Sequence, residues 1–516
     1  MTRTQVQTTS GLLEGIARTA CMEFRGIPYA RPPIGERRFL PPEPPDTWAG
    51  VRMAQGFAAS APQELSPLTG VDRISDDCLY LNVWTPSADA GRRPVLVWFH
   101  GGGFLTGSGH QLLYSGAPLA TAHDCVVVTC NYRLGLFGFA DFAGVLGADF
   151  PAATNLGVRD QVAVLHWVRD NIAAFGGNPD CVTIFGESAG GMSVATLLAV
   201  PSARGLFHRA IVQSGGADFA VSVDDARRVT AVALDALAAT PGARRDALLA
   251  GDPAAIVRAQ RLAVKQTVDR GLRGGQTPQF GMTLLPVVDG DFLPQRPLDA
   301  VAAGAAAGIA LLATVTRDEW NLFVHAPQFA GGRNEKAEQL DEARLRHVFE
   351  RTLPGRGEAA LAFYRGVTDR HRNGKLVDLL CWLESDRMFR IPTARLLDAQ
   401  AQHQTQVYAA QFEWPCPQFG GVLGACHVVD VPLVFGAVGT PAGQFFTGGG
   451  EAAAALSVDV MGAWVAFARN GAPTPVAGDP WPAWSAAGTA ARIGGSTEGA
   501  RPLIDPALAA FWQFLR

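Results

Sequence analysis

An excess of one charge is missing from this 516-residue sequence. The formal net charge is −4, and the chain contains no run of Lys and Arg and no basic stripe with interleaved aromatic residues. Binding to a polyanion needs such a basic surface, so the composition argues against nucleic-acid binding. The hydrophobic share of 48% and the charged share of 17% are ordinary for a globular chain with a large core.

Long apolar segments are also scarce. The most apolar long run, residues 301–315, is too short to cross a bilayer. It predicts an Ala-rich helix, a break at Gly308 and then a buried strand. The first residues lack the apolar segment of a secretory signal. We therefore expect a chain without a membrane span that works in the cytoplasm, unless the sequence is a processed form.

Cysteines are few and scattered. The eight cysteines form no CxxC pair, so the sequence favours neither a disulfide scaffold nor a zinc site. We expect most of them to be buried free thiols. The sequence implies no metal and no organic cofactor.

Apolar runs alternate with helical stretches along much of the chain. Residues 155–177, for example, carry apolar side chains at helical spacing. This alternation predicts an α/β fold with a mostly parallel central sheet and crossover helices. The near-continuous apolarity of the strand-like runs is typical of a sheet that is covered on both faces. Six runs are predicted as strands: residues 94–100, 125–133, 181–185, 210–215, 309–316 and 406–414.

Two long, more polar stretches interrupt this alternation. Residues 220–300 and 326–400 are mainly helical and fall between predicted strands, so we expect them to be cap insertions that shape a pocket. Residues 1–60 are rich in Pro and Gly and predict irregular structure with a small sheet. Because no internal repeat is present, we expect residues 1–516 to form a single domain with insertions.

The strongest motif is FGESAGGM at residues 185–192. Gly-x-Ser-x-Gly alone can be a helix-capping turn. Here, however, a β-branched run precedes Ser188 and a helix-compatible run follows it. A sharp strand-to-helix turn needs small neighbours, which Gly186 and Gly190 supply. The context predicts that Ser188 is a nucleophile and that the following helix points its N-terminus at a developing oxyanion.

A serine nucleophile also needs oxyanion donors, a base and an acid that orients the base. The motif HGGGF at residues 100–104 follows a predicted strand, and its glycines can turn backbone N–H groups toward a substrate oxygen. His100 is expected to stabilise this loop. His427 lies in a loop after a predicted strand, where a base would be useful, but the residues alone leave it one of about four candidates.

These motifs belong to a sequence that resembles the type-B carboxylesterase family, which includes carboxylesterases, cholinesterases and bacterial p-nitrobenzyl-type esterases. The resemblance runs nearly end to end and implies the α/β-hydrolase fold with a triad in the order Ser, acid, His. It rests on FRGIPYARPPIGERRF (24–39), DDCLYLNVWTP (76–86), HGGGF, NYRLGLFGF (131–139), NLGVRDQ (155–161), FGGNPDCVTIFGESAGG (175–191), RDEWNLF (317–323), CHVVDVPLVFG (426–436) and the segment 467–484.

The resemblance also implies individual site residues. The triad would consist of Ser188 as nucleophile, Glu319 as acid and His427 as base. The oxyanion N–H groups would come from Gly102, Gly103 and Ala189.

Two adjacent carboxylates compete for the position of the acid. Neighbouring side chains diverge, so only one of Asp318 and Glu319 can face the imidazole. The resemblance selects Glu319, and Asp318 is then expected to pair with Arg317 or a backbone N–H. The family usually has Gly after the acid, whereas this sequence has Trp320. We expect this side chain to reshape the pocket or to shift the acid loop.

A second departure lies upstream. Secreted relatives pair the cysteine equivalent to Cys78 with another shortly before it, but residues 60–68 contain no Cys, so this bridge should be absent. The same segment lacks the Trp with which cholinesterases hold a quaternary ammonium group. A choline ester is therefore not expected as the preferred substrate.

Together these observations predict a serine carboxylic-ester hydrolase that acts through an acyl-enzyme on short-to-medium or bulky esters. Its expected partner is a small-molecule ester. A catalytically inactive adhesion or binding protein of the same fold is disfavoured, because Ser188 and His427 are both present. Hydrolysis of carbamates, thioesters or amides stays open, since the same groups attack any suitable acyl carbon.

Overall fold

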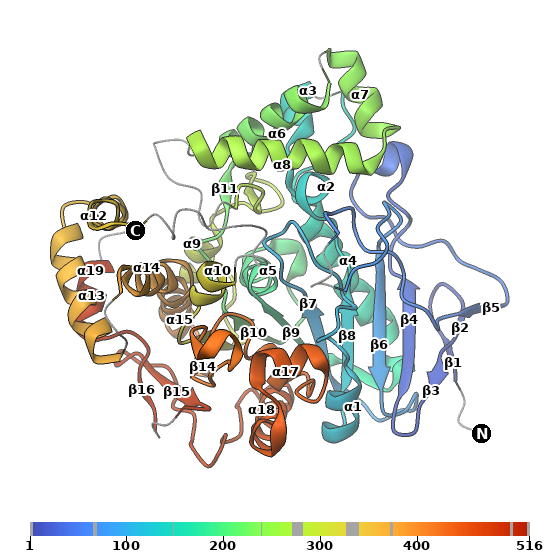
Figure 1. Ribbon diagram of the computed structural model, residues 1–516. Helices are drawn as coiled ribbons and strands as arrows, with labels where there is room; N and C mark the ends of the chain where they lie inside the picture. Colours follow the sequence, from blue (N-terminus) through green and yellow to red (C-terminus); the bar gives the residue numbers. More distant parts are fainter. Residues whose placement is uncertain are drawn as a thin grey trace.

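The fold is built on an 11-stranded sheet, seen in a computed structural model that describes residues 4–65, 70–147, 149–238, 240–270, 282–326, 340–371, 375–495 and 499–512 (Figure 1). From β15 to β8 the neighbouring strands are parallel, and antiparallel pairs lie toward the two edges. In spatial order the strands are β16 (Arg501–Pro502), β15 (Thr489–Ile493), β14 (Val407–Phe412), β13 (Ala310–Thr316), β10 (Arg209–Gln213), β9 (Gly177–Glu187), β7 (Arg93–Phe99), β8 (Val126–Cys130), β6 (Tyr80–Thr85), β4 (Met22–Pro28) and β3 (Ile16–Ala17).

Apolar side chains cover both faces of this sheet. In β7, Val95 and Val97 belong to one buried cluster, whereas Leu96 and Trp98 belong to the other. Successive side chains of a strand point to opposite faces, so a nearly continuous apolar run can fill two cores at once. Helix α4 (Leu156–Asn171) contributes to the first cluster and α18 (Gly450–Asn470) to the second. The six strands and the helix at residues 155–177 predicted from the sequence are confirmed.

Helix α18 is the one described helix that is long and apolar enough to cross a membrane by length and composition. The sequence analysis did not identify it. Its buried side chains include Val460, Trp464 and Phe467, which pack in the second core cluster. It contacts α1 (Ala117–His123), α16 (Val431–Val434), β7 and β9. These contacts make α18 a core helix of the sheet.

The first predicted insertion contains three helices at the top of Figure 1: α6 (Val223–Leu237), α7 (Pro241–Leu249) and α8 (Pro253–Arg270). Its later part holds β12 (Val287–Val288), which pairs with β11 (Val221–Ser222), and α9 (Pro297–Ala302). Residues 271–281 lie outside the described part. The predicted Ala-rich helix up to Gly308 is wrong, because α9 ends at Ala302 and residues 303–308 form turns before β13. Gly308 ends these turns with a φ of +87°.

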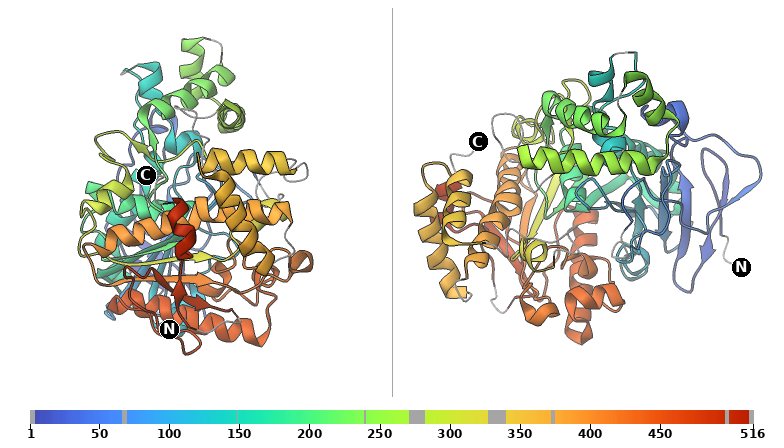
Figure 2. Two further views of the ribbon diagram at one scale, coloured as in Figure 1. Left: turned by 90° about the vertical axis from the view of Figure 1, so that its left-hand side faces the viewer. Right: turned by 45° about the horizontal axis from the view of Figure 1, so that its top comes forward.

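The second insertion is shorter than predicted. Helices α12 (Glu342–Thr352), α13 (Gly357–His371) and α14 (Leu376–Ser385) pack with α19 (Pro506–Trp512) around a small apolar cluster of their own. Helix α15 (Ile391–Ala401) instead contacts β13 and β14, so it is a crossover helix of the sheet. The two insertions form separate groups in both views of Figure 2. Residues 327–339 of the predicted insertion lie outside the described part.

The N-terminal residues form the small sheet that the sequence predicts. It consists of β1 (Gln5–Gln7), β2 (Leu12–Glu14) and β5 (Val51–Met53). All eight cysteines are free, and seven of them are buried. The expected absence of a bridge at Cys78 therefore agrees with the structure.

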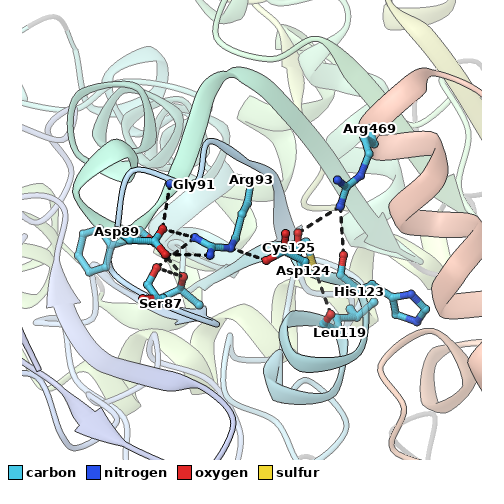
Figure 3. Close-up of polar contacts among 11 residues, drawn as sticks. Ser87, Asp89, Gly91, Arg93, Leu119, His123, Asp124, Cys125 and Arg469 are labelled. Carbon is cyan, nitrogen blue, oxygen red and sulfur yellow. Dashed lines mark hydrogen bonds and ion pairs between the residues drawn. The ribbon is translucent and has the colours of Figure 1, made fainter. Parts of the chain in front are cut away.

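A cluster of ion pairs and hydrogen bonds connects the amino ends of β7 and β8 with the end of α18 (Figure 3). Arg93, the first residue of β7, pairs with Asp89 and Asp124, with N–O distances of 2.5 Å in both pairs. Arg469 at the end of α18 donates to the carbonyls of His123 and Asp124. Because β7 has seven residues, this cluster lies about 20 Å from the carboxyl end of the strand. It stabilises the opposite end of the sheet from the Gly loop.

Candidate active site

Ser188 forms the turn between β9 and α5 (Ala189–Leu197). Its φ of 57° and ψ of −126° are values that a residue with a side chain rarely adopts. The turn is held because the Ser188 N–H donates to the carbonyl of Gln213 at the end of β10, at 2.9 Å. The strand, turn and helix predicted from FGESAGGM are therefore present.

Glycines make this turn possible because backbone atoms approach them closely. A Cβ on Gly190 would lie 1.9 Å from the Phe99 carbonyl oxygen, and one on Gly186 would lie 2.5 Å from the Gly190 carbonyl. A Cβ on Gly191 would lie 2.7 Å from the Gln213 carbonyl oxygen. These atoms belong to β7, β10 and the first turn of α5, so none can move without disturbing the sheet or the helix, and only glycine fits.

The Gly loop at residues 100–104 lies directly against the turn. A Cβ on Gly101 would be 3.1 Å from the Ser188 Cβ. Gly102 and Gly103 have φ values of 114° and 62°, which glycine adopts without strain. In the described part of the chain, the N–H groups of Gly102, Gly103 and Ala189 have no hydrogen-bond acceptor. Three unpaired donors therefore border the serine turn.

His100 stabilises the Gly loop, as the sequence predicts. Its ring is buried, lies 4.4 Å from the ring of Tyr132 in a stacked arrangement, and is bonded through Nδ1 to the Gly101 carbonyl at 2.8 Å. Burial lowers the pKa of His100 to about 4, so the ring is neutral near pH 7.

Glu319 and His427 are hydrogen-bonded to each other in the interior. His427 Nδ1 lies 2.6 Å from Glu319 Oε2. The other carboxylate oxygen accepts from Ser214 Oγ at 2.6 Å and from the Thr316 N–H at 2.7 Å. Glu319 is completely buried. Three hydrogen bonds thus fix the carboxylate and, through it, the orientation of the imidazole.

Asp318 points away from the imidazole. Its Oδ2 is 2.9 Å from an Arg317 guanidinium nitrogen and accepts from the Ala425 N–H at 2.8 Å. Both contacts expected from the sequence are present. The Asp318 N–H also donates to the Ala425 carbonyl at 2.9 Å. Asp318 therefore ties the loop that carries Glu319 to the loop that carries His427.

The second nitrogen of His427 faces the serine turn. His427 Nε2 lies 3.1 Å from Oε1 of Glu187, the residue directly before Ser188. The two atoms are within ion-pair distance but are not aligned as a hydrogen bond. Among the described residues, Ser188 Oγ has no hydrogen-bond partner. Such bonds often form only when substrate is bound.

The carboxylates of Glu187, Glu319 and Asp430 surround the imidazole of His427, and charges at such short range change the pKa values within the group. Burial raises the pKa of Glu187, and the carboxylates of Asp430 and Glu319 add to this, while His427 opposes it. Burial lowers the pKa of His427, but Glu187 and Glu319 outweigh it, so that the pKa is raised. Asp430 is itself held by Gln213 Nε2 at 2.6 Å. Protons in such a cluster are shared, and the apparent pKa values belong to the group.

Aromatic side chains surround the imidazole on its remaining side. Phe389 and Phe323 have ring centroids 4.8 and 5.2 Å from that of His427. Trp320 is buried, its ring packs on that of Phe323 at 5.0 Å, and its backbone N–H donates to Ser385 Oγ at 3.0 Å. With Trp320 in this position, Glu319 and not Asp318 is hydrogen-bonded to His427.

Comparison with known proteins identifies the family. The model of the Carboxylesterase family matches residues 2–502. The chain belongs to this family. It is 35% identical over 496 residues to the para-nitrobenzyl esterase of Bacillus subtilis (strain 168), covering 94% of this chain and 93% of that protein. It is 33% identical over 518 residues to the phenmedipham hydrolase of Pseudarthrobacter oxydans, covering 98% of both.

Solved structures agree with the sequence comparison. The crystal structure of a Geobacillus stearothermophilus carboxylesterase at pH 6.2 matches with a TM-score of 0.84 and 37% identity, covering 99% of this chain and 100% of that one. A para-nitrobenzyl esterase structure matches with a TM-score of 0.82 and 32% identity, covering 99% of both chains. The protein therefore has the α/β-hydrolase fold and is a carboxylic-ester hydrolase.

The carboxylesterase site contains residues that the sequence analysis missed. Glu187 was visible inside the Gly-x-Ser-x-Gly motif, where its carboxyl group was an available signal. Asp430 was also visible, three residues after His427 in the motif CHVVDVPLVFG. Ser214 and Phe389 gave no such signal, because they reach Glu319 and His427 through contacts between distant parts of the chain.

The glycine packing gives a testable prediction. Gly190→Ala should destabilise the enzyme by at least about 2 kcal/mol and abolish most of its esterase activity, because the new methyl group collides with the Phe99 carbonyl. Urea unfolding and an ester assay would measure both effects.

The matched control is Gly366→Ala in α13. This glycine is exposed and an added Cβ would meet no atom within 4 Å, so stability should stay the same or rise slightly. Equal urea midpoints for wild type and Gly190→Ala would contradict the assigned packing.

Proposed function

We propose that Ser188 attacks the acyl carbon of carboxylic esters and that the reaction passes through an acyl-enzyme. The observation that carries this proposal is the buried hydrogen bond between Glu319 and His427, whose second nitrogen faces the strained turn at Ser188. No other part of the site offers a nucleophile with a base and an oriented acid in the described residues.

In the first half-reaction, His427 Nε2 takes the proton from Ser188 Oγ as the oxygen attacks the ester carbonyl. Glu319 stabilises the imidazolium that forms. The N–H groups of Gly102, Gly103 and Ala189 are free to hold the negative oxygen of the tetrahedral intermediate. When the intermediate collapses, the alcohol leaves with the proton from His427. Water then attacks the acyl-enzyme by the reverse sequence and releases the acid.

Short-to-medium acyl groups and bulky alcohols are the substrates that we propose. The loop beside Ser188 is open, because Gly102 is exposed and a Cβ on Gly103 would meet only Met282 Sδ, at 3.9 Å. The aromatic rings of Phe323 and Phe389 beside the imidazole favour apolar or aromatic groups. The name of the B. subtilis relative refers to an ester with a bulky alcohol, which supports this choice.

The first test combines a substrate series with the loss of the nucleophile. Wild type should hydrolyse p-nitrophenyl esters of short and medium acyl chains, with a measurable rate on hindered alcohols. Ser188→Ala should lower kcat on the order of 10⁴-fold or more while the circular dichroism spectrum stays unchanged. Retained turnover in a contaminant-free Ser188→Ala preparation would disprove the nucleophile. A preference for long-chain triglyceride emulsions would disprove the substrate class.

The adjacent carboxylates give the second test. Glu319→Gln should lower kcat by several orders of magnitude, since a neutral amide no longer stabilises the imidazolium. Asp318→Asn should cost far less, because its amide oxygen can still accept from the Ala425 N–H. Steady-state kinetics of both variants decide the assignment. A crippled Asp318→Asn beside a nearly normal Glu319→Gln would show that Asp318 is the acid.

The third test concerns pH. His427 acts as a base only when neutral, so kcat/KM should rise with pH as the imidazole loses its proton. Glu187 and Glu319 raise the pKa of His427. The midpoint of the rise in kcat/KM should therefore lie at a pH above the ordinary histidine pKa of about 6.5. Glu187→Gln removes one of these charges and should move the rise to lower pH.

A pH profile of kcat/KM for both enzymes measures this shift. Asp180→Asn serves as a control, because its carboxylate is 75% exposed and pairs with Arg92 on the surface. A profile of Glu187→Gln that is unshifted, or shifted upward, would show that Glu187 does not act on the base.

A further inference from the structure

A single π-helical turn, Asp386–Arg390, joins α14 to α15. Such turns are rare and often occur at functional sites, because the wider turn redirects side chains that an α-helix would point elsewhere. Here two consecutive side chains reach the catalytic machinery. Phe389 packs against the imidazole of His427, and Arg390 donates to the backbone carbonyl of Arg317 at 2.8 Å.

Arg390 is buried and paired with a buried carboxylate. Its guanidinium contacts Asp386, and the exposed fractions of the two side chains are 5% and 0%. Tyr364 Oη donates to Asp386 Oδ2 at 2.5 Å, and the indole N–H of Trp512 donates to Tyr364 Oη at 3.2 Å. The π-turn is therefore tied to α13 and to α19 at the end of the described chain.

The other end of this network is the acid loop. Arg317, whose carbonyl Arg390 binds, lies two residues before Glu319. Its side chain pairs with Asp318. Burial lowers the pKa of Arg390, and the carboxylates of Glu319 and Asp318 are close enough to oppose this change. If Arg390 served only to pair with Asp386, it would need neither its hydrogen bond to the Arg317 carbonyl nor its position near Glu319.

We propose that Arg390 is a positioning residue of the esterase reaction. It fixes the acid loop through the Arg317 carbonyl while the adjacent Phe389 holds the face of the imidazole, so that one turn of helix sets the distance between Glu319 and His427. Arg390 touches no reacting atom. The inference rests on the roles proposed above for Ser188, Glu319 and His427.

The main test is Arg390→Met, measured with p-nitrophenyl acetate. Loosening the acid–base pair should lower kcat about 10- to 100-fold and change KM less than about threefold, because substrate contacts stay in place. The rate at which a fluorophosphonate probe labels Ser188 should fall by a similar factor. One probe per chain should still be incorporated at the end of the reaction.

Arg93→Met is the matched control. The same substitution there removes a mostly buried arginine that pairs with Asp89 and Asp124 at the far end of the sheet (Figure 3). Its kcat, KM and labelling rate should equal those of wild type at a temperature where both are folded. Arg390→Lys keeps the charge but not the two-pronged guanidinium, so it should recover part of the lost kcat.

Arg390→Met leaves the buried Asp386 carboxylate with its Tyr364 hydrogen bond but without its cationic partner, so a second variant guards against unfolding. Asp386→Asn combined with Arg390→Met removes both charges and should keep the fold, since neutral replacement of a buried ion pair is often tolerated. Its kcat and labelling rate should be as low as those of Arg390→Met. Wild-type values in the folded double variant would overturn the proposal. Failure of the probe to label Ser188 in wild type would instead overturn the proposed function.

Discussion

Glu319, Glu187 and Asp430 bring three carboxylates into a buried space around one imidazole. An unpaired buried charge costs several kcal/mol, so each carboxylate needs donors that do not move. Glu319 has Ser214 Oγ, the Thr316 N–H and His427, and Asp430 has Gln213. Every other feature of the site depends on keeping these donors in place.

The parallel sheet provides this fixed geometry. In the ladder, Gln213 pairs with Glu187 on one side and with Thr314 on the other. The residues that follow, Ser188 and Ser214, both turn with positive φ, at 57° and 45°. Their N–H groups bond to the carbonyls of Gln213 and Thr314. Adjacent strands thus end in register, and this register places Ser188 on the strand next to Ser214, whose hydroxyl donates to Glu319.

The order of residues along the chain predicted those parts of the site that depend on neighbouring residues, namely the central strands and the turn at Ser188. Apolar runs predicted the central strands. The glycines around Ser188 predicted the turn, because an added Cβ there would lie only 1.9–2.7 Å from backbone atoms. The choice of Glu319 as the candidate acid needed the family resemblance, since Asp318 and Glu319 are equivalent by spacing. The end of the second insertion was misplaced because α15 differs from an insertion helix only in what it packs against. Phe389 and Arg390 could not be found, because their contacts join residues 38 and 73 positions away.

Trp320 shows how a family departure can leave the catalytic geometry intact. The acid loop is fixed before this residue, through the Thr316 N–H, the Arg317 carbonyl and the contacts of Asp318 with Ala425. The indole follows these anchors, and its ring packs on Phe323, whose ring in turn packs against His427. The large Trp320 side chain therefore packs on the aromatic rings beside His427 and leaves the hydrogen bonds of the Glu319 carboxylate in place. A residue in this position can therefore alter the aromatic surface beside His427 while Glu319 and His427 stay hydrogen-bonded at 2.6 Å.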